Sequence, residues 1–346
     1  MDMSLSGSAG EPGAGPPMLS VVMPAYNERQ NLPIAYQRLS DAFAPTGLRW
    51  ELIVVDDHSS DDTFQVAADI AERCGNVHAL RLSRNFGSHT AIACGLDQAR
   101  GRCVIIMAAD LQDPPETIPG LIDRWRAGAQ VVWAVRSQRK GESRSTLAFS
   151  RLYYWLMRRV VGLADMPPNG ADFVLLDRVV ADALRHFNER NTSLLALISW
   201  MGFRQSQIRY DKDARLYGRS GWSLGKKLKL VVDSVAAFSF LPIRLMLSVG
   251  VVTALLGLIY AVVIIMNALF GHPAEGWSSL MVIVLVIGGV QMLMLGLLGE
   301  YVWRALDEVR QRPRYLIETE RKGEVEAARP VMPTQTAPTQ AVLYTR

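Results

Sequence analysis

The stretch VIIMAADLQDPPE, residues 104–116, leads from an apolar run into two aspartates, a glutamine, two prolines and a glutamate. The run VIIM has the composition of a buried strand. A charged side chain directly at the end of such a strand is costly to bury unless it is paired or binds a ligand. Asp110, Gln112 and Asp113 are therefore the first candidates for function. The prolines end the element, because proline cannot continue a strand ladder or a helix.

The same pattern of apolar run and polar end recurs along residues 19–135. Five short runs, LSVVM, ELIVV, VHALRL, CVIIM and QVVWAV, alternate with segments of helical length. This alternation predicts an α/β fold whose sheet is mostly parallel and connected by crossover helices. Ligands of such sheets collect at the carboxyl ends of the strands, where Asp56, Asp57 and Asp110 all fall.

The composition narrows the classes of function. The 37 basic and 33 acidic residues leave a net charge of +4, too small to indicate a nucleic-acid partner but compatible with an anionic membrane surface. The three cysteines lack the spacing of a metal site and are interpreted as buried apolar residues. Residues 1–17 lack the basic and apolar regions of a signal peptide and are expected to be a disordered leader.

Two long uncharged runs, residues 245–270 and 276–299, predict two transmembrane helices, since each exceeds the roughly 20 apolar residues that span a bilayer. The loop between them has no Lys or Arg, whereas basic residues precede and follow the pair. The positive-inside rule therefore places both large ends in the cytoplasm. Segments 147–162 and 221–242 mix basic and apolar residues and are expected to lie in the lipid headgroup region. The alternative for the first segment is that its apolar face covers the sheet.

Several common nucleotide-binding and catalytic motifs are missing from the sequence. It has no GxxxxGK[ST] loop, no GxGxxG after the first strand, no GxSxG elbow and no HExxH. The remaining possibility is a set of carboxylates that hold a divalent cation, which in turn holds a diphosphate.

Four segments, VVMPAYNERQNL, IVVDDHSSDDT, RLSRNFGSHTAIACGLDQARG and ADLQDPPE, occur in this order. In order and spacing they resemble the family 2 glycosyltransferases of the GT-A fold, and more narrowly the polyprenyl-phosphate glycosyltransferases. The resemblance covers residues 18–315. It implies a catalytic domain, Rossmann-like and of the α/β class, followed by amphipathic interface helices and two transmembrane helices.

The resemblance implies a donor site for a nucleotide sugar. The residues expected to contact the donor are Pro24, Ala25, Tyr26, Glu28, Asp57, Arg84, Asp110 and Gln112. Either Asp56 or Asp57 would accept hydrogen bonds from the base. Asp110, with Gln112 beside it, would coordinate Mg²⁺ or Mn²⁺ on the donor diphosphate. The family's frequent Asp-Ala-Asp pattern is incomplete here, because Ala108 replaces the first acid, so that the diphosphate or Asp113 is left to complete the coordination.

The resemblance also implies an acceptor site. Asp172 matches an acidic residue near the acceptor, although Val174 stands where the pattern often has arginine. A mobile loop rich in arginine would close on the diphosphate and the lipid phosphate. The expected catalytic residues are Asp172, Arg215 and Ser220, and those for the acceptor phosphate are Arg215, Tyr217, Arg219 and Ser223. A basic patch that binds only anionic lipid is the alternative for this loop.

The expected function is inverting transfer of a hexose from a nucleotide sugar, with UDP-glucose as first choice, to undecaprenyl or another polyprenyl phosphate. The alternatives are another lipid or polysaccharide acceptor, and a non-catalytic membrane scaffold with this fold. The charged segment after the second apolar run is a candidate for pairing with a second copy. The expected organisation is a leader (1–17), a cytoplasmic catalytic domain (18–220), a juxtamembrane segment (221–244), two membrane helices (245–301) and a cytoplasmic C-terminal segment and tail (302–346).

Overall fold

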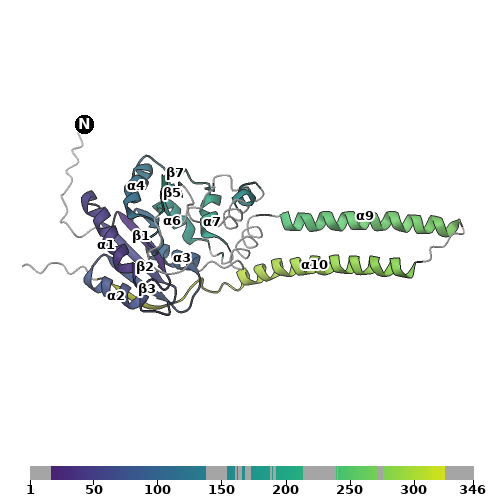
Figure 1. Ribbon diagram of the computed structural model, residues 1–346, viewed down its shortest axis with the longest axis horizontal. Coiled ribbons are helices and arrows are strands. Elements are labelled where there is room, and N and C mark those ends of the chain that lie inside the picture. The colour runs from purple at the N-terminus through teal and green to yellow at the C-terminus, as the bar shows by residue number, and fades with distance from the viewer. Residues whose placement is uncertain are drawn as a thin grey trace, which may run out of the picture.

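The computed structural model describes residues 17–137, 154–159, 162, 166–167, 173–187, 189, 192–212, 239, 241–270 and 276–323. Within them, eight strands form one sheet (Figure 1). The strands are β1 (Leu19–Ala25), β2 (Trp50–Asp56), β3 (Val77–Leu82), β4 (Cys103–Ile106), β5 (Val131–Arg136), β6 (Phe173–Asp177), β7 (Gln205–Tyr210) and β8 (Ile317–Lys322). Their order in the sheet is β7-β5-β6-β4-β1-β2-β3-β8.

The central part of the sheet is parallel, as the sequence predicts. Strand β1 pairs in parallel with β2 and β4, β2 pairs in parallel with β3, and β5 pairs in parallel with β7. Strands β6 and β8 run antiparallel to their neighbours. All five predicted strands are present, with ends within two residues of those expected. The predicted fold class is confirmed.

Helices cover both faces of the sheet, which explains why its strands read as continuous apolar runs. On one face lie α1 (Asn31–Phe43), α2 (Thr63–Arg73) and α4 (Ile118–Arg126), and on the other lie α3 (Ser88–Gln98), α6 (Arg178–Arg185) and α7 (Leu194–Trp200). Successive strand residues alternate between the two cores. Val21 and Met23 pack into the first core and Val22 packs into the second.

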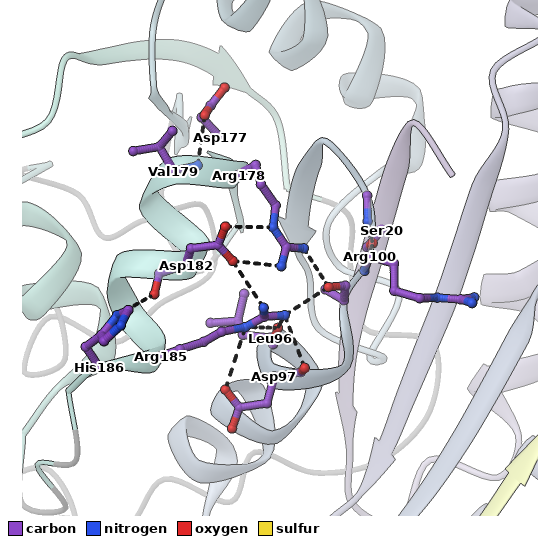
Figure 2. A network of polar contacts seen from close by, with 12 residues as sticks. Ser20, Leu96, Asp97, Arg100, Asp177, Arg178, Val179, Asp182, Arg185 and His186 are labelled. Carbon is purple, nitrogen blue, oxygen red and sulfur yellow. Dashed lines mark hydrogen bonds and ion pairs between the residues drawn. The ribbon is translucent and has the colours of Figure 1, made fainter. Parts of the chain in front are cut away.

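Two arginines fasten α6 to the end of α3 (Figure 2). Arg185 donates through Nη2 to the carbonyls of Leu96, Asp97 and Ala99, at 2.7, 3.1 and 2.9 Å. Arg178 donates through Nη1 to the carbonyl of Ala99 at 2.6 Å. These carbonyls belong to the C-terminal turn of α3, where helical partners are lacking and cations are favourable. The contacts explain how a helix between two distant strands keeps a defined position on the sheet.

Two long apolar helices leave the sheet domain side by side and antiparallel (Figure 1). They are α9 (Leu241–Leu269) and α10 (Trp277–Val309). At about 1.5 Å per residue, α9 is about 44 Å long, more than the roughly 30 Å of a bilayer core. No part of their most apolar windows is buried in the protein. By length and composition both are candidate membrane spans. Helix α10 continues beyond the uncharged run to Val309.

The chain returns to the sheet after α10, which the sequence did not predict. Strand β8 pairs with β3 and covers the edge of the sheet. Tyr315 donates a hydrogen bond to Asp97 Oδ2 at 2.6 Å, and Arg314 donates to the carbonyl of Phe187 at 2.7 Å. Residues 314–322 of the charged segment proposed above for pairing with a second copy thus contact their own chain, and the pairing with a second copy stays a prediction. The strands that precede and follow the helical hairpin, β7 and β8, therefore belong to one sheet.

The first prediction concerns the end of β8. A Cβ atom on Gly323 would lie 2.6 Å from the carbonyl oxygens of Ala71 and Cys74, which are backbone atoms and cannot move aside cheaply. Gly323→Ala is therefore expected to cost about 1–3 kcal/mol and to speed hydrogen exchange in β3 and β8. Gly120→Ala is the control, because its Cβ would meet only Ile208 at an ordinary 3.5 Å within a helix. Unchanged exchange in the Gly323 variant would contradict the prediction.

The two segments expected at the lipid headgroups are only partly described. Residues 154–159 are helical, Met157 is fully buried and Trp155 is 56% exposed. This short helix therefore packs one face on the protein and turns another outward. In the second segment, only Ser239 and the first residues of α9 lie within the described residues.

Candidate functional site

The carboxyl edge of the central strands contains a topological switch point. The chain runs from β1 to β2 and β3 on one side of β1, and then crosses to β4 on the other side. Sheets of this type bind ligands in the crevice outside the strand ends where the order reverses, here between β1 and β4. Tyr26 follows β1 and Asp110 closely follows β4. Two of the expected donor residues therefore follow the two strands that flank the switch point.

The end of β1 presents one side chain outward. Tyr26 is 49% exposed, whereas Ala25 is buried and its carbonyl accepts a hydrogen bond from the backbone N–H of Asp57 at 2.9 Å. Pro24 is partly buried within the strand. Of these three expected donor contacts, Tyr26 is the one whose side chain is available to a ligand, and Ala25 instead joins the ends of β1 and β2.

The loop after β1 is tied to the loop after β2. Asn27 has a left-handed backbone with φ of 58°. Its N–H donates to Ser59 Oγ at 2.9 Å, and its Oδ1 accepts from the N–H of Ser60 at 2.9 Å. Glu28 donates its N–H to Thr63 Oγ1 at 2.8 Å and accepts through Oε2 from the side chain of Asn31. These bonds make the two loops one preorganised unit.

Asp56 supports this unit from within. Its side chain is fully buried, and Oδ1 accepts hydrogen bonds from the N–H and the hydroxyl of Ser59. Arg81 lies 3.6 Å from Asp56 Oδ2 and donates to the carbonyl of Ser59 at 3.3 Å. Burial raises the pKa of Asp56, while the bonds to Ser59 and the charge of Arg81 oppose the rise. Of the two acids considered for the base, Asp56 is thus committed to the protein.

Asp57 reaches in another direction. Its two carboxylate oxygens accept the backbone N–H groups of Phe86 and Gly87, at 2.7 and 2.8 Å. Burial raises the pKa of Asp57 against the effect of these bonds. Asp57 is therefore the anchor of the loop after β3. That loop carries Arg84, an exposed side chain whose guanidinium lies 4.5 Å from the centre of the Phe86 ring.

Asp110 lies in a tight turn after β4. Its side chain is 7% exposed, and Oδ1 accepts the N–H of Gln112 at 3.2 Å. Leu111 between them has φ of 60°, a conformation that costs a non-glycine residue roughly 1–2 kcal/mol. Such strain persists where the surroundings impose it, and it is common at ligand sites.

The oxygen groups of this turn suit a hard divalent cation. A carboxylate and an amide oxygen are ligands of Mg²⁺ and Mn²⁺, and Mg²⁺ is commonly held by one or two carboxylates together with substrate phosphates and water. Among the described residues, no group of three or more His, Cys, Asp and Glu side chains is placed to hold a metal. The residues present therefore fit a cation held jointly by the protein and a diphosphate.

Asp113, which follows this turn, is bound to a distant strand. Its side chain is 1% exposed, and Oδ1 accepts the hydroxyl of Tyr210 on β7 at 2.5 Å. A role for Asp113 in replacing the acid missing at position 108 stays a prediction, because the bond to Tyr210 engages one of its two carboxylate oxygens. Ala108 itself is half-buried.

The expected acceptor residues lie outside the described residues. They are Asp172, Arg215, Tyr217, Arg219, Ser220 and Ser223. Val174, where the family pattern often has arginine, is fully buried on β6 and pairs with Ile106 and Trp133. It is a core residue, which accounts for its apolar side chain.

Two residues of the site were missed in the sequence. Arg81 on β3 contacts Asp56 on the adjacent strand β2, and Tyr210 on β7 contacts Asp113 after β4. Their positions in the last two residues of a strand were the available signal for a role at this edge. The partner of each lies far away in the chain, so that no local spacing indicates it.

Comparison with known families agrees with this geometry. The profile of Glycosyl transferase family 2 matches residues 20–208, and that of the GtrB C-terminal hairpin matches residues 241–304. The first covers the sheet domain from β1 into β7, and the second covers α9 and most of α10.

Relatives match over nearly the whole chain. The glycosyltransferase YkcC of Bacillus subtilis is 37% identical over 300 residues, which cover 86% of this chain and 93% of that protein. The SfII prophage-derived bactoprenol glucosyl transferase of Shigella flexneri is 33% identical over 306 residues, 88% of this chain and 99% of that protein. Among solved structures, glucosyl-3-phosphoglycerate synthase from Mycobacterium tuberculosis, in complex with Mn²⁺, UDP-glucose and phosphoglyceric acid, aligns with a TM-score of 0.44 at 19% identity, over 64% of this chain and 79% of that one. On the family match and the full-length relatives, this chain belongs to glycosyl transferase family 2 and is a glycosyltransferase with a GT-A-like sheet domain and a C-terminal helical hairpin.

Proposed function

We propose that the enzyme transfers a glucosyl unit from UDP-glucose to a polyprenyl phosphate, undecaprenyl phosphate in the first instance, with inversion at the anomeric carbon. The observation that carries this proposal is that the sheet with the switch point between β1 and β4 also includes β8, the strand that follows the apolar helical hairpin. A hairpin of this kind keeps the catalytic domain beside an acceptor that cannot leave the membrane. Relatives that span the same length are named bactoprenol glucosyl transferases.

The donor half of the proposal uses described residues. Tyr26, which is exposed after β1, would stack on the base of the donor. The remaining lone pairs of the Asp57 carboxylate would accept a hydrogen bond from an N–H group of that base. Arg84 would approach the diphosphate from the loop that Asp57 anchors. Asp110 and Gln112 would hold Mg²⁺ or Mn²⁺, which, when bound, offsets the charge that develops on the departing diphosphate.

The transfer itself needs no enzyme nucleophile. An oxygen of the lipid phosphate forms the bond to the anomeric carbon while the bond to the donor diphosphate breaks, and the electron pair leaves with the nucleoside diphosphate. The acceptor oxygen is already anionic, so no proton must be removed. We assign Asp172 to orientation of the acceptor, and we assign Arg215 and Arg219 to the phosphates, because arginine presents forked donors that suit phosphate oxygens.

We also propose that both termini and the catalytic domain face the cytoplasm. The pairing of β8 with β3 supports one side for both ends of the hairpin. Basic residues flank the two apolar runs on that side, and the connecting loop has none.

The second prediction tests the reaction and the donor together. Full-length protein incubated with undecaprenyl phosphate, Mn²⁺ and a panel of nucleotide sugars is expected to yield a lipid monophosphate hexose only with UDP-glucose, as read by mass spectrometry of the lipid phase. A product from UDP-N-acetylhexosamine or GDP-mannose would correct the sugar. No lipid product with any donor, from protein that binds UDP, would favour another acceptor or a scaffold.

A further inference from the structure

A buried hydrogen bond joins the segment after the candidate cation turn to β7, the strand at one edge of the sheet. Tyr210 is the last residue of β7, and its hydroxyl donates to Asp113, three positions after Asp110 in the chain. The two side chains are 6% and 1% exposed. The two residues are 97 positions apart in the sequence, so the bond connects the end of a strand to a loop that is distant in the chain.

The tyrosine end of this bond is held firmly. The ring of Tyr210 packs edge-on against Phe173, with 5.9 Å between ring centres and 89° between planes. Its carbonyl accepts from the N–H and the hydroxyl of Ser137, at 2.8 and 3.1 Å. Burial and the neighbouring charge of Asp113 raise the pKa of Tyr210, so the phenol stays protonated and remains the donor.

The aspartate end restrains a strained turn. Leu111 keeps its left-handed backbone between Asp110 and Gln112, and Asp113 follows directly. A strained backbone persists only when contacts on both sides impose it. Before the turn, the N–H of Met107 donates to the carbonyl of Val22 at 3.1 Å. After the turn, Asp113 is bound by Tyr210, so the two expected metal ligands lie between two fixed points.

The position of Tyr210 in the chain adds a second connection. Arg215, assigned above to the acceptor phosphate, follows it by five residues. The hydrogen bond therefore joins the expected donor turn to the residue after which the expected acceptor-binding residues, from Arg215 on, begin.

We propose that Tyr210 and Asp113 are positioning residues of the donor site, whose hydrogen bond holds the turn of residues 110–112 in the geometry that binds a metal-diphosphate. The role rests on the proposed function, since it requires a cation at Asp110. Neither residue touches the substrate. Their effect passes through the backbone of the turn and through its alignment with β7.

The third prediction is a loss of metal-dependent nucleotide binding in Tyr210→Phe. The variant keeps the aromatic packing and removes only the hydroxyl. Calorimetric titration of the full-length protein with UDP in Mn²⁺, which needs no turnover, is expected to show affinity reduced about tenfold, the lower end of the effect of outer-shell changes on metal sites. UDP binding in a chelator is expected to be unchanged. Asp113→Ala should reproduce the loss, and Asp113→Asn, whose amide oxygen still accepts the hydroxyl, should largely restore binding.

Tyr315→Phe provides a matched control. Its hydroxyl also donates to an aspartate, Asp97, at 2.6 Å, but it lies in the segment between α10 and β8. The control is expected to lower thermal stability as Tyr210→Phe does and to leave UDP binding in Mn²⁺ unchanged. Equal Mn²⁺-dependent binding in both phenylalanine variants would overturn the positioning role. If Tyr210→Phe fails to fold, Asp113→Ala takes its place in the test. Wild-type-like UDP binding in Mn²⁺ by Asp113→Ala would then overturn the positioning role.

The transfer assay on the wild-type protein reports on the proposed function separately. Product formed by the wild type, together with normal Mn²⁺-dependent binding in Tyr210→Phe, overturns only the positioning role. UDP binding by the wild type that is indifferent to Mn²⁺ overturns both the cation site and the role of Tyr210.

Discussion

Asp110→Asn is expected to lower kcat/KM for the transfer by about 10²–10³-fold, on the order of the loss when one preorganised electrostatic contact to the transition state is removed. Asparagine is nearly isosteric and its amide oxygen still accepts the N–H of Gln112, so the turn is kept. The neutral amide is a poor ligand for a hard cation, and the charge on the leaving diphosphate is then poorly offset. Position 108 is alanine, so the acid that the family pattern often has there is not present to compensate.

The rate of lipid product formation at saturating Mn²⁺ measures this effect, and the unfolding temperature confirms that the fold is intact. Asp41→Asn is the control, because Asp41 is exposed on α1 and accepts a hydrogen bond only from its neighbour Gln37 in the described contacts. It is expected to keep the full rate. A loss of less than about tenfold in Asp110→Asn, a barrier change of under about 1.4 kcal/mol, would remove Asp110 from the cation site.

Asp57→Ala is expected to destabilise the protein by about 2–4 kcal/mol and to weaken UDP binding by about tenfold or more. The change leaves the N–H groups of Phe86 and Gly87 without their acceptor, and each unsatisfied donor costs about 1–3 kcal/mol. The loop after β3 then loses its anchor, and Arg84 loses its fixed approach to the donor.

Arg84→Ala separates anchoring from direct contact. Arg84 is exposed, and its described contact is with the ring of Phe86, so its removal is expected to weaken UDP binding without lowering the unfolding temperature. Thermal unfolding and calorimetric titration of both variants measure the two effects. An Asp57→Ala protein as stable as the wild type would show that the two backbone bonds contribute little.

The part of the site that follows strands was predictable from the sequence. A polar residue directly after an apolar run marks the carboxyl end of a strand, and the βα alternation places those ends on one edge. This was enough to place Tyr26, Asp57 and Asp110 after the carboxyl ends of β1, β2 and β4. It was not enough to separate Asp56 from Asp57, because adjacent residues at a strand end point to opposite sides. In the structure their partners differ, since Asp56 binds Ser59 and Asp57 binds the loop at Phe86.

The sequence by itself determined the five parallel-type strands, their crossover helices and the apolar hairpin, because periodicity and composition are local properties of the chain. Only the tertiary structure decided that β8 closes the sheet beside β3, that Asp113 is bound by Tyr210, and that Ala25 is buried while Tyr26 is exposed. These contacts join residues far apart in the chain or depend on which neighbours cover a side chain. They follow from the topology that brings distant segments together, and a local sequence pattern does not predict that topology.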